Sequence, residues 1–263
     1  MKKELGKTKK SIYNFITMFI NTFALSFISL ISTNLIINRY GSDFNGVVAT
    51  ANQFVNLLLI VEGGFTLVIN ISLFKPYTSN NQKKIDSIMS AANKTFKKIA
   101  ILFFVIGLIA SALCPFIIKS SLAYSYIFLI FLMVIFSTAY NLFFVVTSKI
   151  MFQVSQQEYV YTSIAALFNI LSGLTTIILI LNNVNMLIIR LSVMLYSLIN
   201  GLIIYILYKR TFPKINTKAK PDNSAIKGTK DVMIQKITSV IYTSTPVLFI
   251  SSFIGTKMAS VYN

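Results

Sequence analysis

Apolar residues form stretches that are long enough to cross a membrane. A spanning helix needs about 20 mostly apolar residues to cross about 30 Å of hydrocarbon. Seven stretches have this character, at residues 12–37, 47–74, 99–118, 122–146, 163–181, 186–208 and 237–254. The last is the weakest, because Pro246 and several hydroxyl side chains interrupt it. The pattern predicts an all-α integral membrane protein with seven transmembrane helices.

The composition supports a membrane protein and excludes several kinds of active site. Hydrophobic residues make up 55% of the 263 residues and charged residues only 12%, against about 25% charged residues in soluble domains. The chain has no His, no Trp and a single cysteine, Cys114. A His-dependent catalytic triad, a disulfide framework and a Cys/His metal site therefore cannot be built. We expect neither an enzyme nor a bound cofactor or metal.

Basic residues are distributed unevenly between the two sides of the predicted helices. The net charge is +17, and 20 of the 24 Lys and Arg fall in the N-terminal tail and in alternate connecting segments. The intervening segments hold only Arg39, Lys119 and Lys257, and Arg190 lies within a helix. Because Lys and Arg near helix ends stay in the cytoplasm, the N-terminus is predicted to be cytoplasmic. Anionic phospholipid, at about 1 kcal/mol per nearby basic residue, accounts for this charge without a nucleic acid.

Two of the basic segments are longer than turns. Residues 75–98 place apolar side chains at helical spacing, with lysines largely on other faces, and this predicts a helix along the inner membrane surface. Residues 209–236 contain two prolines, a glycine and eight basic residues, a composition that favours a linker. We therefore divide the chain into a six-helix lobe (1–208), a basic cytoplasmic linker (209–236) and the first helix of a second lobe (237–263).

The segment after this linker repeats features of the beginning of the chain. STNLIINRYG near Ser32 is similar to STPVLFISSFIG near Ser244, although the match needs a gap of two residues. Six helices return a chain to the side where it began, so a parallel repeat would begin at this point. A lone seventh helix leaves its polar face against lipid. We therefore expect the second lobe to continue beyond the sequence given.

Polar side chains recur every three or four residues inside the first two predicted helices. One stripe includes Asn21, and the other includes Asn52 and Asn56. Such stripes either line a water-filled cavity or bond to neighbouring helices, at about 0.6 kcal/mol per contact in membrane proteins. Both interpretations stay open, and these three residues are candidates for substrate contact.

Glu62 is predicted to lie near the middle of the bilayer. Thirteen residues separate it from Lys75, which corresponds to about 20 Å of helix. A charge at that depth is costly, so Glu62 must be protonated, paired or hydrated. It is a candidate for proton or cation coupling or for substrate contact, with Gly63 and Gly64 able to unwind the helix beside it. The alternative is a neutral Glu62 that bonds a neighbouring helix.

Arg190 is the only basic residue predicted within a helix, five positions from Asn185 and nearer the outer surface. Its forked donors can hold a phosphate if it faces a cavity. Outward snorkelling to the membrane surface is the alternative. Lys149 and Glu158 border a predicted cytoplasmic turn, where solvated charges are ordinary, and we assign them no role.

Several strings resemble the bacterial polysaccharide flippases (Wzx-type) of the multidrug/oligosaccharidyl-lipid/polysaccharide exporter superfamily. They are INRYGSDFNGVVATANQFVNLLLIVEGGFT at 37–66, LFKPY at 73–77, IDSIMSAANK at 85–94, SQQEYVYTSI at 155–164 and ISSFIGTKMASVYN at 250–263. The resemblance covers nearly the whole chain and implies the first six-helix lobe of a MATE-like transporter fold plus a seventh helix. One departure is Pro246 after Thr245, where members often show an acidic residue, so this sequence has no carboxylate for coupling at that position.

The resemblance implies a function in polysaccharide biosynthesis. Its members flip undecaprenyl-pyrophosphate-linked oligosaccharide across the bacterial cytoplasmic membrane, through a cavity between two lobes that opens alternately to each side. The expected partners are this lipid-linked oligosaccharide, anionic phospholipid and a coupling proton or cation. The alternatives are a drug or cation antiporter of the same superfamily and a non-transporting membrane fragment, because an embedded carboxylate such as Glu62 fits an antiporter equally well.

Overall fold

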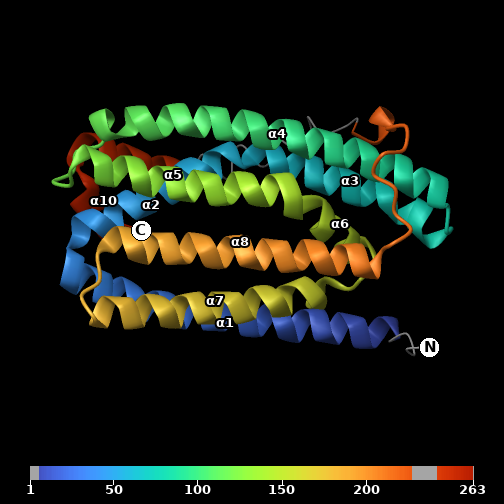
Figure 1. The fold of residues 1–263 in the computed structure, drawn as a ribbon, viewed down its shortest axis with the longest axis horizontal. Helices are drawn as coiled ribbons and strands as arrows, with labels where there is room; N and C mark the ends of the chain where they lie inside the picture. The colour runs from blue at the N-terminus through green and yellow to red at the C-terminus, as the bar shows by residue number, and fades with distance from the viewer. Residues whose placement is uncertain (1–5, 227–241, 263) are drawn as a thin grey trace.

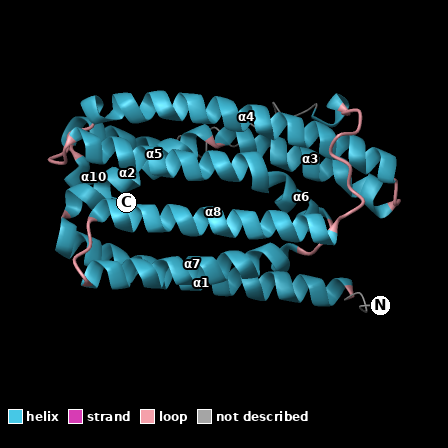
Figure 2. Ribbon diagram, in the orientation of Figure 1, coloured by secondary structure: helices cyan, strands magenta, loops and turns pink. Residues whose placement is uncertain are grey.

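The computed structural model describes residues 6–226 and 242–262, and every regular element within these ranges is helical. The helices run nearly parallel to one long axis (Figure 1), and most of them are joined by short loops, apart from a longer segment that follows α8 (Figure 2). The longer α-helices are α1 (Lys7–Tyr40), α2 (Ser42–Leu58), α3 (Ile60–Thr78), α4 (Gln82–Ile117), α5 (Tyr124–Tyr140), α6 (Val146–Val154), α7 (Glu158–Leu181) and α8 (Met186–Thr211). A helix over Tyr242–Ile254 and the short α10 (Thr256–Tyr262) follow.

Five of these helices are long and apolar enough to cross a membrane. They span Thr8–Tyr40, Gln82–Ile117, Tyr124–Val154, Glu158–Leu181 and Met186–Thr211. The α2 and α3 pair adds a sixth span if it is counted as one helix with a bend of 46°. These six correspond to the first six predicted helices. The predicted seventh begins at residue 237, outside the described residues, and its described part is a shorter apolar helix.

The second predicted helix is broken, although not at its glycines. Leu59 separates α2 from α3, and its backbone N–H still bonds to the carbonyl of Val55 at 3.0 Å. Gly63 and Gly64 lie inside α3, and the N–H of Gly63 reaches the carbonyl of Leu59 at 3.2 Å. The predicted unwinding therefore falls one turn before the glycine pair.

The prediction of a separate helix on the membrane surface at 75–98 is wrong. This segment is divided between the end of α3, a turn, and the first half of α4, which continues without interruption to Ile117. At 36 residues, α4 is about 54 Å long, well beyond the about 30 Å of a hydrocarbon core. Its apolar face is covered by protein, because Ile88, Met89 and Phe96 are fully buried in a cluster with Ile69 and Leu73 of α3.

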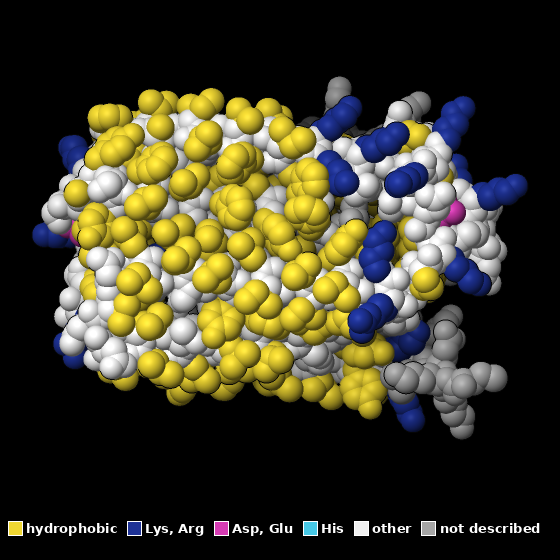
Figure 3. Space-filling view, viewed as in Figure 1, with side chains coloured by type: hydrophobic (Ala, Val, Ile, Leu, Met, Phe, Trp, Pro, Cys, Tyr) yellow, Lys and Arg dark blue, Asp and Glu magenta, His cyan; other side chains and the backbone are white. Residues whose placement is uncertain are grey.

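The two ends of the bundle differ in charge. One end carries the N-terminus, the α3–α4 and α6–α7 turns and residues 212–226 (Figure 1), and basic side chains gather there in Figure 3, whereas the remaining visible face is mostly hydrophobic. We call this the basic end. The opposite end carries the turns near Gly41, Lys119 and Asn183. The uneven distribution of charge in the sequence thus becomes a separation in space.

Residues 212–226 lie against the basic end of α4. The Lys84 ammonium is 2.5 Å from the Asp222 carboxylate, and the N–H of Asp222 donates to the carbonyl of Ser87 at 3.1 Å. The Ser90 hydroxyl donates to the carbonyl of Ala219 at 2.6 Å. This first part of the predicted linker is therefore docked on the helical bundle, and its later part lies outside the described residues.

Candidate functional site: a polar tract within the bundle

Arg190 faces the interior of the bundle. It lies on α8, whose first turn is capped by Asn185, which accepts from the N–H of Leu187 at 2.8 Å. Arg190 lines two cavities, one of about 250 Å³ and one of about 340 Å³. Its guanidinium carbon lies 5.8 Å from the centre of the Phe44 ring, and its Nε is shielded from solvent without a hydrogen-bond partner among residues 6–226 and 242–262. Of the two predicted placements, the structure shows the cavity and not the surface.

Asn52 and Asn56 of α2 share these cavities with Arg190. Asn52 lines both, and Asn56 lines the smaller one, where it also donates to Gln53 at 3.2 Å. The larger cavity lies between α1, α2, α7 and α8, and its other polar lining residues are Ser29, Ser32, Thr33, Asn45, Asn169, Ser172 and Thr176. The candidate contacts on α2 are therefore brought together with Arg190, as a substrate cavity requires.

Asn21 has a different environment. Its Oδ1 accepts from Asn169 of α7 at 3.1 Å, and one turn earlier the hydroxyls of Thr17 and Thr162 are 2.9 Å apart. At the next turn, Asn14 accepts from the N–H of Tyr159 at 2.6 Å. The polar stripe near the start of α1 thus fastens α1 to α7, and Asn21 reaches the larger cavity only through Asn169. In this part of the stripe the structure shows helix packing, whereas Ser29 and Ser32 farther along α1 line the larger cavity.

Glu62 lines a third cavity, of about 260 Å³, near the start of α3. Its Oε1 accepts from Thr66 at 2.5 Å. Lys149 of α6 lines the same cavity, and the Glu62 carboxylate acts on its ammonium electrostatically. The structure therefore corrects our assignment of Lys149 to an ordinary solvated turn. It gives Glu62 a counter-charge that the sequence did not identify.

A π-helix explains why the sequence did not reveal this pair. Asn141–Val145 forms a π-helix between α5 and α6. The extra residue in such a turn rotates everything that follows by about 100° relative to a regular helix. The sequence pattern ends this helix at residue 146, whereas the span continues through the π-helix to Val154, so Lys149 lies on a helix and not in a turn. Asn141, a polar residue in an otherwise apolar stretch, is the first residue of this π-helix.

Further polar side chains extend the Glu62 cavity toward the basic end. Gln153, which lines it, accepts from Asn70 at 2.9 Å and donates to Glu158 at 3.4 Å and to Tyr161 at 3.3 Å. Tyr161 donates to Glu158, and the Lys149 ammonium lies 5.8 Å from the centre of its ring. Glu158 is therefore also part of a polar cluster, which differs from the role-free position that we predicted.

The Glu62 and Arg190 cavities have one wall residue in common. Thr138 of α5 lines both the cavity of Glu62 and the smaller cavity of Arg190. Polar residues therefore form a tract, which we define as Gln153, Lys149, Glu62, Thr138, Asn52, Asn56 and Arg190. The tract contains two cations and one acid between amide and hydroxyl groups. Such a lining can bind an anion at either cation and can hydrogen-bond to hydroxyl-rich molecules.

No group of three or more His, Cys, Asp or Glu able to hold a metal ion occurs among residues 6–226 and 242–262.

Comparisons of the chain with protein-family models, with curated proteins and with solved structures found no match. The functional interpretation therefore depends on the tract itself and on the resemblance described above.

Proposed function

We propose that this protein is a flippase of the bacterial cytoplasmic membrane that moves undecaprenyl-pyrophosphate-linked oligosaccharide toward the outer leaflet. Residues 1–208 are its first six-helix lobe of the MATE-like fold, and 237–263 begin the second lobe. The basic end faces the cytoplasm and contacts anionic phospholipid. The seven apolar stretches, the separation of basic residues and the flippase-like strings support this proposal.

Arg190 is the observation that carries the proposal. A guanidinium within a membrane-spanning bundle is costly unless a partner compensates it. The Nε of Arg190 is shielded and has no partner in the part of the chain that the structure describes. A guanidinium offers planar, forked donors that match two oxygens of a phosphate group. A pyrophosphate at Arg190 would compensate the charge of the guanidinium and accept its hydrogen bonds, while sugar hydroxyls would bond to the amide and hydroxyl side chains of the cavity walls.

Binding of a labelled lipid tests this assignment without a transport measurement. The purified full chain in detergent micelles is titrated with fluorescent undecaprenyl-pyrophosphate-linked oligosaccharide. Arg190→Leu should weaken binding at least about tenfold, because it removes a charge-assisted bidentate contact. Arg190→Lys should fall between Arg190→Leu and the parent. Arg39→Gln, which removes an exposed Arg at the opposite end, should bind like the parent.

The alternative of a drug or cation antiporter is supported by Glu62, an acid within the tract. The two functions differ in what the tract binds. An antiporter should bind a lipophilic cation such as ethidium, and Arg190→Leu should strengthen that binding by removing a like charge. Parent protein that binds ethidium but not the lipid-linked oligosaccharide would replace the flippase proposal with the antiporter.

A further inference from the structure

The C-terminal part of the chain packs against α2 at the opposite end of the bundle. The helix Tyr242–Ile254 and α10 contact α2 through a small apolar cluster of Ala49, Val247 and Ala259, with Ile250 at its edge. The two clusters within the six-helix bundle contain 17 and 14 buried residues. Among residues 242–262 the buried apolar contact with α2 is therefore small, and polar contacts accompany it.

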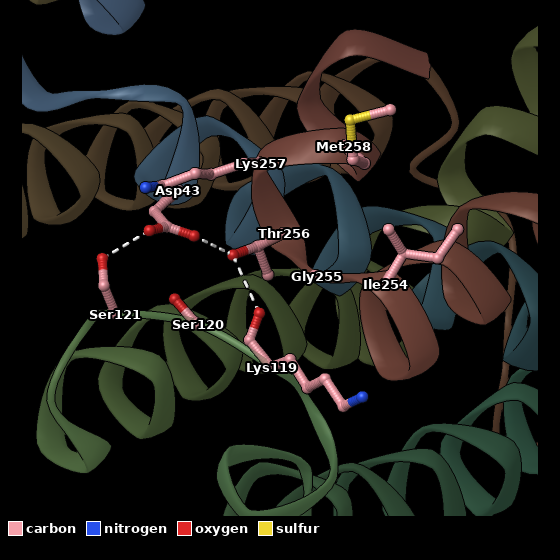
Figure 4. Close-up of a pocket in the computed structure, with 9 residues that line it drawn as sticks. All are labelled: Asp43, Lys119, Ser120, Ser121, Ile254, Gly255, Thr256, Lys257 and Met258. Carbon is pink, nitrogen blue, oxygen red and sulfur yellow. Dashed lines mark hydrogen bonds between the residues drawn. The ribbon is translucent and has the colours of Figure 1, made fainter.

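Asp43 lies at the centre of these polar contacts. It is on the first turn of α2 and is only 6% exposed. Its carboxylate accepts from Ser121, in the α4–α5 loop, and from Thr256, the first residue of α10 (Figure 4). Lys257 adds a favourable electrostatic interaction beside it. Hydrogen bonds to a carboxylate are about twice as strong as those between neutral groups. One acid thus joins three segments that are distant in the sequence.

The α4–α5 loop contributes main-chain contacts to the same arrangement. The N–H of Thr256 donates to the carbonyl of Lys119 at 3.0 Å, and the N–H of Lys119 donates to the carbonyl of Ser251 at 3.2 Å. The Lys119 ammonium donates to the carbonyl of Phe253 at 2.8 Å. We call these bonds, with the two bonds to Asp43, the Asp43 clasp. A cavity of about 390 Å³ lies beside the clasp.

The α10 helix also contacts a wall residue of the Arg190 cavity. Asn45 lines the larger cavity, and its side chain donates to the hydroxyl of Ser260 in α10 at 2.9 Å. Ala49, which lines the same cavity, belongs to the apolar cluster with Val247 and Ala259. The approach of α10 to α2 is close, because a Cβ at Gly46 would lie 1.8 Å from the Thr256 carbonyl oxygen. Movement of α10 would therefore change the wall of the Arg190 cavity.

We infer that the Asp43 clasp is a releasable closure that holds α10 against α2 at the outer end of the Arg190 cavity. The contact depends on hydrogen bonds near the end of the bundle, where water can replace them when it opens. A large apolar interface would instead favour permanent packing. The inference rests on the proposed function for the meaning of opening, which is the release of cargo on the outer side.

Reactivity of a thiol at position 260 measures whether the clasp opens. Ser260→Cys is introduced into a Cys114→Ala background, because Cys114 is the only cysteine. Position 260 is 7% exposed in the closed arrangement, so a membrane-impermeant maleimide should react slowly from the outside of cells. Asp43→Asn should raise that rate about tenfold, because the bonds lose their charged acceptor. Thr256→Val, which removes one bond, should raise it about threefold.

Three further variants make the result decisive. Gly46→Ala should raise the rate at least as much as Asp43→Asn, since its Cβ displaces α10 directly. Ser120 lines the cavity beside the clasp, but its hydroxyl accepts from the N–H of Leu122 and does not bond to Asp43. Ser120→Ala should therefore leave the rate unchanged. Lys218→Gln, an exposed residue at the basic end, should also leave it unchanged. The rate is measured without lipid-linked oligosaccharide, so failure of lipid binding and failure of the clasp are distinguishable. Parent rates in Asp43→Asn, Thr256→Val and Gly46→Ala would overturn the inference.

Discussion

At the scale of single residues, the charges inside the bundle are of two kinds. The Nε of Arg190 is shielded from solvent and has no hydrogen-bond partner among the described residues, a condition that favours a ligand. Glu62 and Lys149 instead line the same cavity, and the Glu62 carboxylate acts electrostatically on the Lys149 ammonium. An unpaired charge at that depth costs far more than a paired one. The stability of each member should therefore depend on the other.

We predict that Glu62 and Lys149 are energetically coupled. Glu62→Gln and Lys149→Met should each destabilise the protein by about 1–3 kcal/mol, because each leaves its partner uncompensated. The double variant should be less destabilised than the sum of the two by about 1 kcal/mol. This double-mutant cycle is measured by heating the detergent-solubilised protein and recording, for each variant, how much of the monodisperse peak in size-exclusion chromatography remains at each temperature. Lys75→Met, an exposed lysine near the end of α3, should be additive with Glu62→Gln. Additivity of Lys149→Met with Glu62→Gln would show that the two charges act independently.

At the scale of helices, the sequence pattern predicts the number of long apolar segments well and their irregularities poorly. The first six predicted helices correspond to the five spans and the bent pair, because about 20 apolar residues can avoid water in few other ways. The pattern of apolar residues predicts neither the break at Leu59, nor the π-turn at Asn141–Val145, nor the continuity of α4. Amphipathic spacing in 85–96 indicates a covered face but does not tell lipid from protein as the cover. The sequence pattern also does not reveal the contacts of Asp43, because its partners Ser121 and Thr256 are distant in the sequence.

The docking of residues 212–226 on α4 should weaken when the pH falls below about 4. Hydrogen bonds from Lys84 and Ser224 lower the pKa of Asp222 from its ordinary 3.8 to about 2. A depressed pKa means that the carboxylate stabilises docking above about pH 4, and that this contribution is lost as the pH falls toward 2. The pair is partly exposed, so it is worth about 1 kcal/mol or less.

Hydrogen exchange of the amides in 214–222, corrected for intrinsic rates, measures this effect. Protection in the parent should fall up to about fivefold between pH 4 and pH 2. Asp222→Asn should show, at both pH 4 and pH 2, the low protection that the parent shows at pH 2. Lys218→Gln, an exposed cation on the same segment, should follow the parent. Equal protection of Asp222→Asn and parent at pH 4 would show that Asp222 does not hold the segment.

At the scale of the whole molecule, charge and polarity are arranged along one axis. Basic side chains gather at one end, and the tract extends inward from Gln153 near that end to Arg190, beyond which the Asp43 clasp lies at the opposite end. For a flippase, an anionic headgroup would meet Lys149 before Arg190 and would leave past the clasp. This direction depends on which end faces the cytoplasm, so the orientation is the most informative property to measure.

We predict that the basic end is cytoplasmic, because 20 of the 24 basic residues lie in the N-terminal tail and alternate segments whereas only Arg39, Lys119 and Lys257 lie in the others. Single cysteines introduced by Lys10→Cys and Lys84→Cys, in a Cys114→Ala background, should react with an impermeant maleimide only in inverted membrane vesicles. Those introduced by Asn182→Cys and Tyr262→Cys should react only in intact cells. The four positions lie in four different segments, so one misassigned helix would give a mixed pattern, whereas an inverted protein would reverse all four. Reversal would place the Asp43 clasp at the cytoplasmic side, and release past it could then no longer deliver cargo to the outer leaflet. Agreement at all four positions would orient the tract with Lys149 nearer the cytoplasm and Arg190 nearer the outside, the order that an outward-moving anion requires.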